Sequence, residues 1–114
     1  MVRRQKMKYR NRKTVTDGIA FDSLKEATRY RDLKAKLDAG LISNLVLQHK
    51  FTLIPSQNWK GVKERPVVYI ADFMYNDNKT GELIVEDVKG VKTAEYVIKR
   101  KLLLHTHGFP VREI

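Results

Sequence analysis

Two short runs near the middle of the chain bring acidic side chains into apolar surroundings. Asp72 lies in YIADFMY, and Glu86 and Asp87 end LIVED, with Lys89 two residues further on. Burying carboxylates and an ammonium group among apolar side chains is unfavourable unless they are paired or hold a cation. Two neighbouring carboxylates suit Mg²⁺, which binds one or two carboxylates and keeps several waters. These residues indicate either a magnesium site or an ordinary buried ion pair of the lysine with one acid.

The spacing of these charges places them on defined faces of a strand. Side chains two residues apart share a face, so Asp87 and Lys89 lie together and Glu86 lies on the other face. Both faces are apolar before the charges begin, which indicates an interior strand covered on both sides. The turn NDNKTG is short enough for an antiparallel pair that brings Asp72 toward Asp87. We expect the carbonyl of Val88 to be a further metal ligand, and Lys89 to orient a water or offset charge on a phosphate.

Hydrophobic periodicity and turn signals predict the elements that position these residues. Asp17-Gly18 predicts a hairpin turn, Ser23 and Gly40 fit the two ends of a helix, and Trp59 is expected to cover part of the core edge. We predict strands at about 12–16, 19–21, 44–54, 67–75 and 83–89, a helix of about 15 residues after Ser23 and another at about 93–105, a polar loop or hairpin tip at 55–65, and a terminal edge strand in FPVREI.

The length of 114 residues indicates one domain with a modest core. We predict a basic flexible arm at 1–13 and a single α/β domain at 14–114. The domain has a central mixed β-sheet of about four to five strands, flanked by two helices and preceded by a β-hairpin. The absence of cysteine excludes disulfides and thiolate zinc sites. No run approaches the roughly 20 apolar residues of a membrane span, so we expect no membrane association and a cytoplasmic location.

Glu26 fits two different roles. Residues 23–26 (SLKE) match an S-x-x-E capping box, in which the Glu side chain reaches back to the backbone at the helix start. Glu26 also heads the apolar stripe that faces the sheet, where Asp72 and Asp87 are expected. The sequence therefore leaves a metal-site role and a capping role open.

Basic side chains outnumber acidic ones by 23 to 13, and residues 1–13 hold seven of the basic ones and no acid. Such an arm suits the phosphate backbone of DNA, although a solubilising tail or an arm for acidic protein or lipid has the same composition. A solvated surface is likewise the alternative for polar residues of the later elements. The candidate DNA-binding residues are Arg3, Arg4, Arg10, Arg12 and Lys13 in the arm, Gln48 in the 44–54 strand, and Tyr96, Lys99 and Arg100 on the second helix.

The motifs resemble those of a known superfamily. IAD followed 15 residues later by DVK, with SLKEA on the helix before, is similar to the PD-(D/E)XK nucleases, whose motif is an acid, a spacer and D/E-x-K. The runs DGIAFDSLKEATRY, LQHKFTLIP, RPVVYIADFMY and VEDVKGVKTAEYVIKRKL resemble a small family of phages and prophages, often described only as a domain of unknown function, over about residues 9–105. More distantly, the arrangement is similar to the heteromeric transposase endonuclease domain and to archaeal Holliday-junction resolvases.

This resemblance implies a restriction-endonuclease-like core and a role for each matching residue. Asp72 matches the first acid, Asp87 the second acid and Lys89 the lysine of the motif. Glu26 matches the helix acid that contacts the metal directly or through water. Ala71 stands where the motif has a proline, which is a variable part of the pattern.

Together, the residues and the resemblance predict an endodeoxyribonuclease that uses Mg²⁺ or Mn²⁺ to activate the attacking water. We expect it to recognise the shape, a branch or an end of DNA, because a short chain offers few surfaces for base readout. We also expect a homodimer, and the resemblance implies phage DNA replication or recombination, with a partner from that process, in the bacterial host cell. The alternatives are a non-catalytic DNA-binding module and a nuclease subunit that is active only with a partner protein.

Overall fold

The computed structural model describes residues 13–114, so the predicted basic arm lies outside the described residues except for Lys13. The described chain begins with a hairpin of β2 (Thr14–Thr16) and β3 (Ile19–Phe21). The two turn residues, Asp17 and Gly18, have φ angles of 54° and 75°. This left-handed geometry is what a two-residue hairpin turn requires. The predicted hairpin is therefore confirmed, although residue 12, the predicted start of its first strand, is not described.

Helix α1 (Leu24–Asp38) begins and ends where its capping residues predict. The Ser23 hydroxyl accepts a hydrogen bond from the backbone N–H of Glu26 at 3.1 Å, which satisfies one of the free donors of the first turn. At the other end Gly40 has a φ of 77°, and its N–H donates to the carbonyl of Leu37 at 3.1 Å. This closure of the last turn directs the chain from the helix into the sheet.

The central sheet has four strands in the order β4-β7-β8-β9. The first three are antiparallel neighbours and the fourth is parallel to β8, so the sheet is mixed, as predicted. Helix α2 connects β8 to β9, and within residues 13–114 neither helix is long and apolar enough to cross a membrane. The bounds are β4 (Ile42–Ile54), β7 (Val67–Asp77), β8 (Leu83–Asp87), α2 (Ala94–His107) and β9 (Val111–Glu113). Strand β8 ends two residues earlier than predicted.

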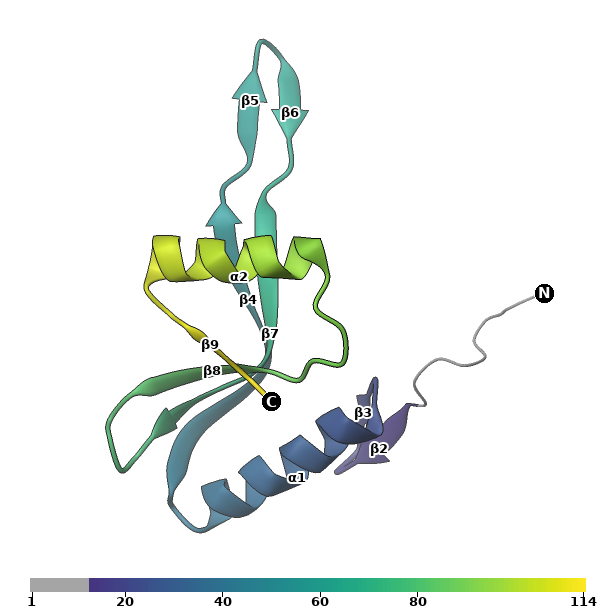
Figure 1. Ribbon diagram of the computed structural model, residues 1–114, viewed down its shortest axis with the longest axis vertical. Coiled ribbons are helices and arrows are strands. Elements are labelled where there is room, and N and C mark those ends of the chain that lie inside the picture. The colour runs from purple at the N-terminus through teal and green to yellow at the C-terminus, as the bar shows by residue number, and fades with distance from the viewer. Residues whose placement is uncertain (1–12) are drawn as a thin grey trace, which may run out of the picture.

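A second hairpin, β5 (Gln57–Trp59) and β6 (Val62–Glu64), joins β4 to β7 and projects from the rest of the fold (Figure 1). Pro55 and Pro66 flank it, and because proline donates no backbone hydrogen bond, the ladder of the main sheet stops there. The predicted hairpin tip is confirmed. Trp59 is 71% exposed, so the prediction that it covers the core edge is wrong.

Two clusters of buried side chains form the core. One joins α1 to Phe73 of β7 and Ile84 of β8, and the other joins α2 to Ala71 and Val85 of the same strands. Figure 1 shows α2 crossing the upper part of β4 and β7, with α1 beside the lower part of the sheet. The prediction that β8 is covered on both faces is confirmed. Along β7 the buried residues pass from one cluster to the other at Asp72.

Candidate active site

Asp72 lies at the centre of β7, at this boundary between the two clusters. Gln48 lies opposite on β4 and donates a hydrogen bond from Nε2 to Asp72 Oδ1 at 3.2 Å. Its φ of 54° is left-handed, which distorts the strand locally. The backbone N–H of Val88, the residue after β8, donates to Asp72 Oδ2 at 2.8 Å. The carboxylate of Asp72 therefore links three neighbouring segments of the sheet at one point.

Asp87, the last residue of β8, is 2% exposed and shares a hydrogen bond with Asp72. The hydroxyl of Tyr69 donates to Asp87 Oδ2, and Nζ of Lys89 lies 3.5 Å from the same oxygen. Burial, followed by the hydrogen bond with Asp72, raises the pKa of Asp87 from 3.8 to about 7, against the opposing effects of Tyr69 and Lys89. This carboxyl group therefore retains a proton close to neutral pH.

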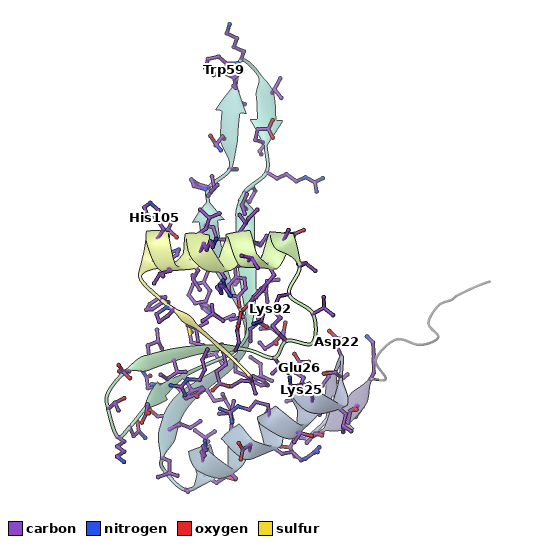
Figure 2. The ribbon with its side chains drawn as sticks, viewed as in Figure 1. Asp22, Lys25, Glu26, Trp59, Lys92 and His105 are labelled. Atoms are coloured by element: carbon purple, nitrogen blue, oxygen red, sulfur yellow. The ribbon has the colours of Figure 1, made fainter. Side chains whose placement is uncertain are left out.

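Glu26 lies in the first turn of α1, close to Asp22 (Figure 2), and its side chain forms a hydrogen bond with Asp72. Its Oε1 accepts a hydrogen bond from the backbone N–H of Asp22 at 3.2 Å, one residue before the N-cap Ser23. Burial and a hydrogen bond with Asp72 raise the pKa of Glu26 from 4.5 to about 7. The side chain contacts both the backbone at the helix start and Asp72, so its two predicted roles do not exclude each other.

Asp72 is the charged member of the three carboxyl groups. Burial acts to raise its pKa, but hydrogen bonds from Asp87, Glu26, the Val88 N–H and Gln48 outweigh burial and leave the pKa below 3.8. Near neutral pH the two flanking acids are thus only partly ionised, whereas the pKa of the central carboxylate is lowered. Carboxylates must be deprotonated to bind a metal ion, so a divalent cation would take the place of the remaining protons.

The donor atoms of this site fit Mg²⁺ by their chemistry. All are oxygens, and Mg²⁺ is generally held by one or two carboxylates with waters, without a complete protein cage. Residues 13–114 contain no group of three or more His, Cys, Asp or Glu side chains already arranged around a metal position. The acids instead approach one another in pairs through Asp72. The carbonyl of Val88 stays a predicted ligand.

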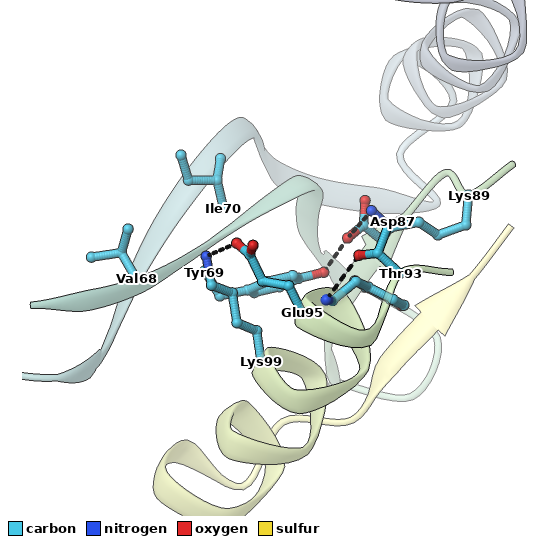
Figure 3. Close-up of a pocket in the computed structure, with 9 residues that line it drawn as sticks. Val68, Tyr69, Ile70, Asp87, Lys89, Thr93, Glu95 and Lys99 are labelled. Carbon is cyan, nitrogen blue, oxygen red and sulfur yellow. Dashed lines mark hydrogen bonds and ion pairs between the residues drawn. The ribbon is translucent and has the colours of Figure 1, made fainter. Parts of the chain in front are cut away.

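Asp87 and Lys89 line a pocket of about 350 Å³ between β7 and α2 (Figure 3). Nζ of Lys89 lies 4.2 Å from the ring centroid of Tyr96, which holds the cation against the pocket wall. Lys99 lines the same pocket and pairs with Glu95 at 2.9 Å. Two lysines and a buried acid border one cavity, so the cavity suits an anionic ligand that also binds a cation.

Two predicted DNA-binding residues of α2 are engaged inside the protein. Tyr96 Oη donates to Glu113 Oε2 at 2.7 Å, and Arg100 Nη1 donates to the same oxygen at 2.8 Å. With Lys92, these contacts lower the pKa of Glu113 to about 2. Tyr96 and Lys99 both line the pocket, and Lys99 is the one of the two that carries a positive charge. Of the arm residues, Lys13 is exposed and pairs with Asp22 at 3.8 Å, whereas Arg3, Arg4, Arg10 and Arg12 lie outside the described residues.

Glu86 belongs to a separate ion pair that the sequence analysis did not identify. Its carboxylate is fully buried, accepts hydrogen bonds from Arg29 Nε and Nη2 at 2.8 and 2.6 Å, and accepts another from the Tyr75 hydroxyl. The predicted separation of Glu86 from Asp87 onto opposite faces is confirmed. The available signal was helical spacing, because Arg29 lies three residues after Glu26 on the sheet-facing side of α1. The contact of Tyr69 with Asp87 had no comparable signal in the sequence.

Comparison with known proteins places the chain in a family without assigning an activity. No curated protein and no solved structure matches it. Residues 6–110 match the family described as "Protein of unknown function (DUF1064)". Since this match spans nearly the whole chain, the protein belongs to that family.

Proposed function

We propose that this protein is a Mg²⁺- or Mn²⁺-dependent endodeoxyribonuclease that hydrolyses phosphodiester bonds in DNA. The observation that carries the proposal is the convergence of Glu26, Asp72 and Asp87 from three elements, with Lys89 beside them. A structural role needs only a paired charge, as Glu86 has with Arg29 and Asp87 has with Lys89, and does not require Glu26 and Asp72 to adjoin Asp87. Adjoining acids disfavour one another's ionisation unless a cation binds, so their convergence favours a metal site.

Each residue has a definite part in this proposal. A bound Mg²⁺ supplies Lewis-acid activation of the phosphate ester. Asp72 provides the carboxylate that is ionised in the free protein, and Asp87 and Glu26 release their protons as the cation binds. The ammonium group of Lys89 offsets the negative charge that develops on the phosphate.

The charge of the chain supports DNA as the substrate. The net charge is +10, and Lys89 and Lys99 border the pocket beside the acids. The basic side chains of residues 1–13 contact the phosphate backbone, where neutralisation releases counterions. A homodimer supplies one site for each DNA strand. The resemblance to the phage and prophage family supports a role in phage DNA replication or recombination in the cytoplasm of the host cell.

The test combines metal binding with cleavage on the same samples. Wild type, Asp87→Ala and a control variant are titrated with Mn²⁺ by calorimetry. The control is Glu82→Gln, which changes an exposed acid directly before β8. Each is also incubated with supercoiled, nicked and branched DNA in Mg²⁺ or Mn²⁺. We expect wild type and the control to bind metal and cut DNA, and Asp87→Ala to lose both. Cleavage that persists in a folded Asp87→Ala protein would refute the assigned site.

Two other results would replace the proposal by one of its alternatives. Salt-sensitive DNA binding without cleavage in any metal would identify a DNA-binding module. Cleavage that appears only when a partner protein is added would identify a nuclease subunit.

A further inference from the structure

The β5-β6 hairpin carries an exposed indole at its tip. Every residue from 55 to 66 is exposed, and Trp59 and its cross-strand partner Val62 are 71% and 58% exposed. Figure 2 shows Trp59 at the far end of the hairpin, away from both helices. The candidate active site does not use this segment, although β7 leads directly from the hairpin to Asp72.

The hairpin has the features of a defined structure. Lys60 and Gly61 form its turn with φ angles of 50° and 84°, the left-handed pair that matches the twist of the two strands. The N–H of Gly61 also donates to the side-chain oxygen of Asn58 at 3.0 Å. Trp59 is thus held on a paired strand with its ring in solvent, so little conformational entropy is lost when the ring meets a ligand.

Positive charge surrounds this aromatic side chain. Nζ of Lys60 lies 5.4 Å from the ring centroid of Trp59. Lys63 lies on the returning strand and Arg65 directly after it, and Glu64 is the one acid between Pro55 and Pro66. An apolar contact for a protein would gain nothing from this charge. An exposed ring among cations is the combination by which proteins bind unpaired nucleotides, since bases stack on the ring and phosphates meet the cations.

We propose that the β5-β6 hairpin binds unpaired or terminal nucleotides of DNA, with a base stacked on Trp59 and neighbouring phosphates held by Lys60, Lys63 and Arg65. The bases of an intact duplex have both faces covered, so the hairpin directs the protein to branches, gaps and ends. This inference deepens the proposed function and rests on its assignment of DNA as the substrate. It supplies the structural selectivity that the pocket by itself does not.

The position of the hairpin also limits where cleavage occurs. Val62 and Asp72 are ten residues apart, so they are separated by at most about 33 Å at about 3.3 Å per strand residue. One turn of B-DNA, about ten base pairs, spans about 34 Å. The cut phosphodiester therefore lies within about one helical turn of the unpaired base.

Trp59 is the only tryptophan of the chain, so its fluorescence reports on this contact alone. Wild-type protein in EDTA, where cleavage is prevented, is titrated with single-stranded DNA, forked DNA and relaxed, covalently closed circular duplex DNA, which has neither ends nor unpaired bases. We expect the first two to quench the fluorescence more strongly than the duplex. Trp59→Ala should weaken binding to forked DNA about 5- to 140-fold, the value of one stacked base, and leave duplex binding unchanged. Trp59→Phe should restore part of the loss.

Controls separate this contact from general changes. Val15→Ala removes another exposed apolar side chain, on the β2-β3 hairpin, and should bind all three DNAs as wild type does. Replacement of Lys60 and Lys63 by glutamine should reduce the salt dependence of binding. Circular dichroism checks that each variant is folded.

Three outcomes would overturn the inference. These are unchanged fluorescence with forked DNA, equal binding by Trp59→Ala and wild type, and a tryptophan signal that follows protein concentration and dimer mass without DNA. The last would identify the hairpin as a contact between copies of this chain. Stacking of a base on Trp59 without DNA cleavage in any metal would keep the hairpin assignment and refute the proposed nuclease activity. DNA cleavage together with unchanged DNA binding by Trp59→Ala would keep the nuclease activity and refute the hairpin assignment.

Discussion

Asp87→Asn is expected to stabilise the metal-free protein at alkaline pH. The asparagine oxygen can accept the hydrogen bond from Tyr69, and its NH₂ group can donate to Asp72, so the amide reproduces the protonated form of Asp87. Unlike the carboxyl group, the amide cannot ionise. The substitution therefore retains the contacts of the low-pH protein and removes the repulsion that appears when the proton is lost.

The magnitude follows from the pKa of the folded protein. In the folded protein the pKa of Asp87 is about 7, against an ordinary value of 3.8, and the pKa of Glu26 is about 7, against 4.5. At a pH between the ordinary and the raised pKa, the folded protein therefore binds more protons than the unfolded chain. Stability then falls as pH rises, by about 1.4 kcal/mol per pH unit for each extra proton. Between pH 5 and pH 8 one such acid removes about 2–3 kcal/mol, and Asp87→Asn should abolish its share of that loss.

Urea unfolding in EDTA at pH 5 and pH 8 measures this difference. Wild type should lose stability over the interval, and Asp87→Asn should lose about half as much and exceed wild type at pH 8. Adding Mn²⁺ at pH 8 should stabilise wild type, by about 2.7 kcal/mol at one hundred times Kd, and leave the variant unchanged. Equal pH dependence of the two proteins, or a variant less stable at both pH values, would refute the reasoning.

Four further substitutions test the site and its surroundings. Glu86→Ala should cost about 3–5 kcal/mol in urea unfolding, because Arg29 loses its buried partner and keeps only its pair with the exposed Asp32; an absence of this loss would mean that the buried pair is unimportant. Ser23→Ala should cost about 1 kcal/mol of stability through the lost helix cap and keep the Mn²⁺ affinity. Glu26→Gln should weaken Mn²⁺ binding in calorimetry. If Glu26→Gln instead loses stability and keeps its Mn²⁺ affinity, Glu26 is only a cap. Leu33→Ala, at a fully buried position, should cost about 2–5 kcal/mol by denaturant unfolding, and a loss below 1 kcal/mol would contradict its place in the core.

Local chemistry made much of the fold predictable. The turn at Asp17-Gly18 and the helix between Ser23 and Gly40 follow from backbone preferences of residues a few positions apart. The alternation of side chains along β8 likewise places Glu86 and Asp87 on opposite faces of the sheet, because a strand has a period of two residues. Each of these features depends on neighbours in the chain, so one sequence is sufficient to infer it.

Other features depend on contacts that the linear sequence does not encode directly. The sequence predicts that Trp59 covers part of the core edge, but flanking prolines separate its hairpin from the sheet, and the ring lies in solvent. Composition and spacing likewise do not identify Tyr69 as the hydrogen-bond donor to Asp87.

The acids of the candidate site illustrate the same division. Their residue types and the spacing of Asp72, Asp87 and Lys89 are properties of the sequence, and these alone suggested a cation site. The tertiary structure decides that Glu26 joins them from α1, and that the pKa of Asp72 is lowered while the pKa values of its two neighbours are raised. The physical reason is that a pKa depends on burial and on atoms a few ångströms away, which come from segments 15 to 61 residues apart in this chain.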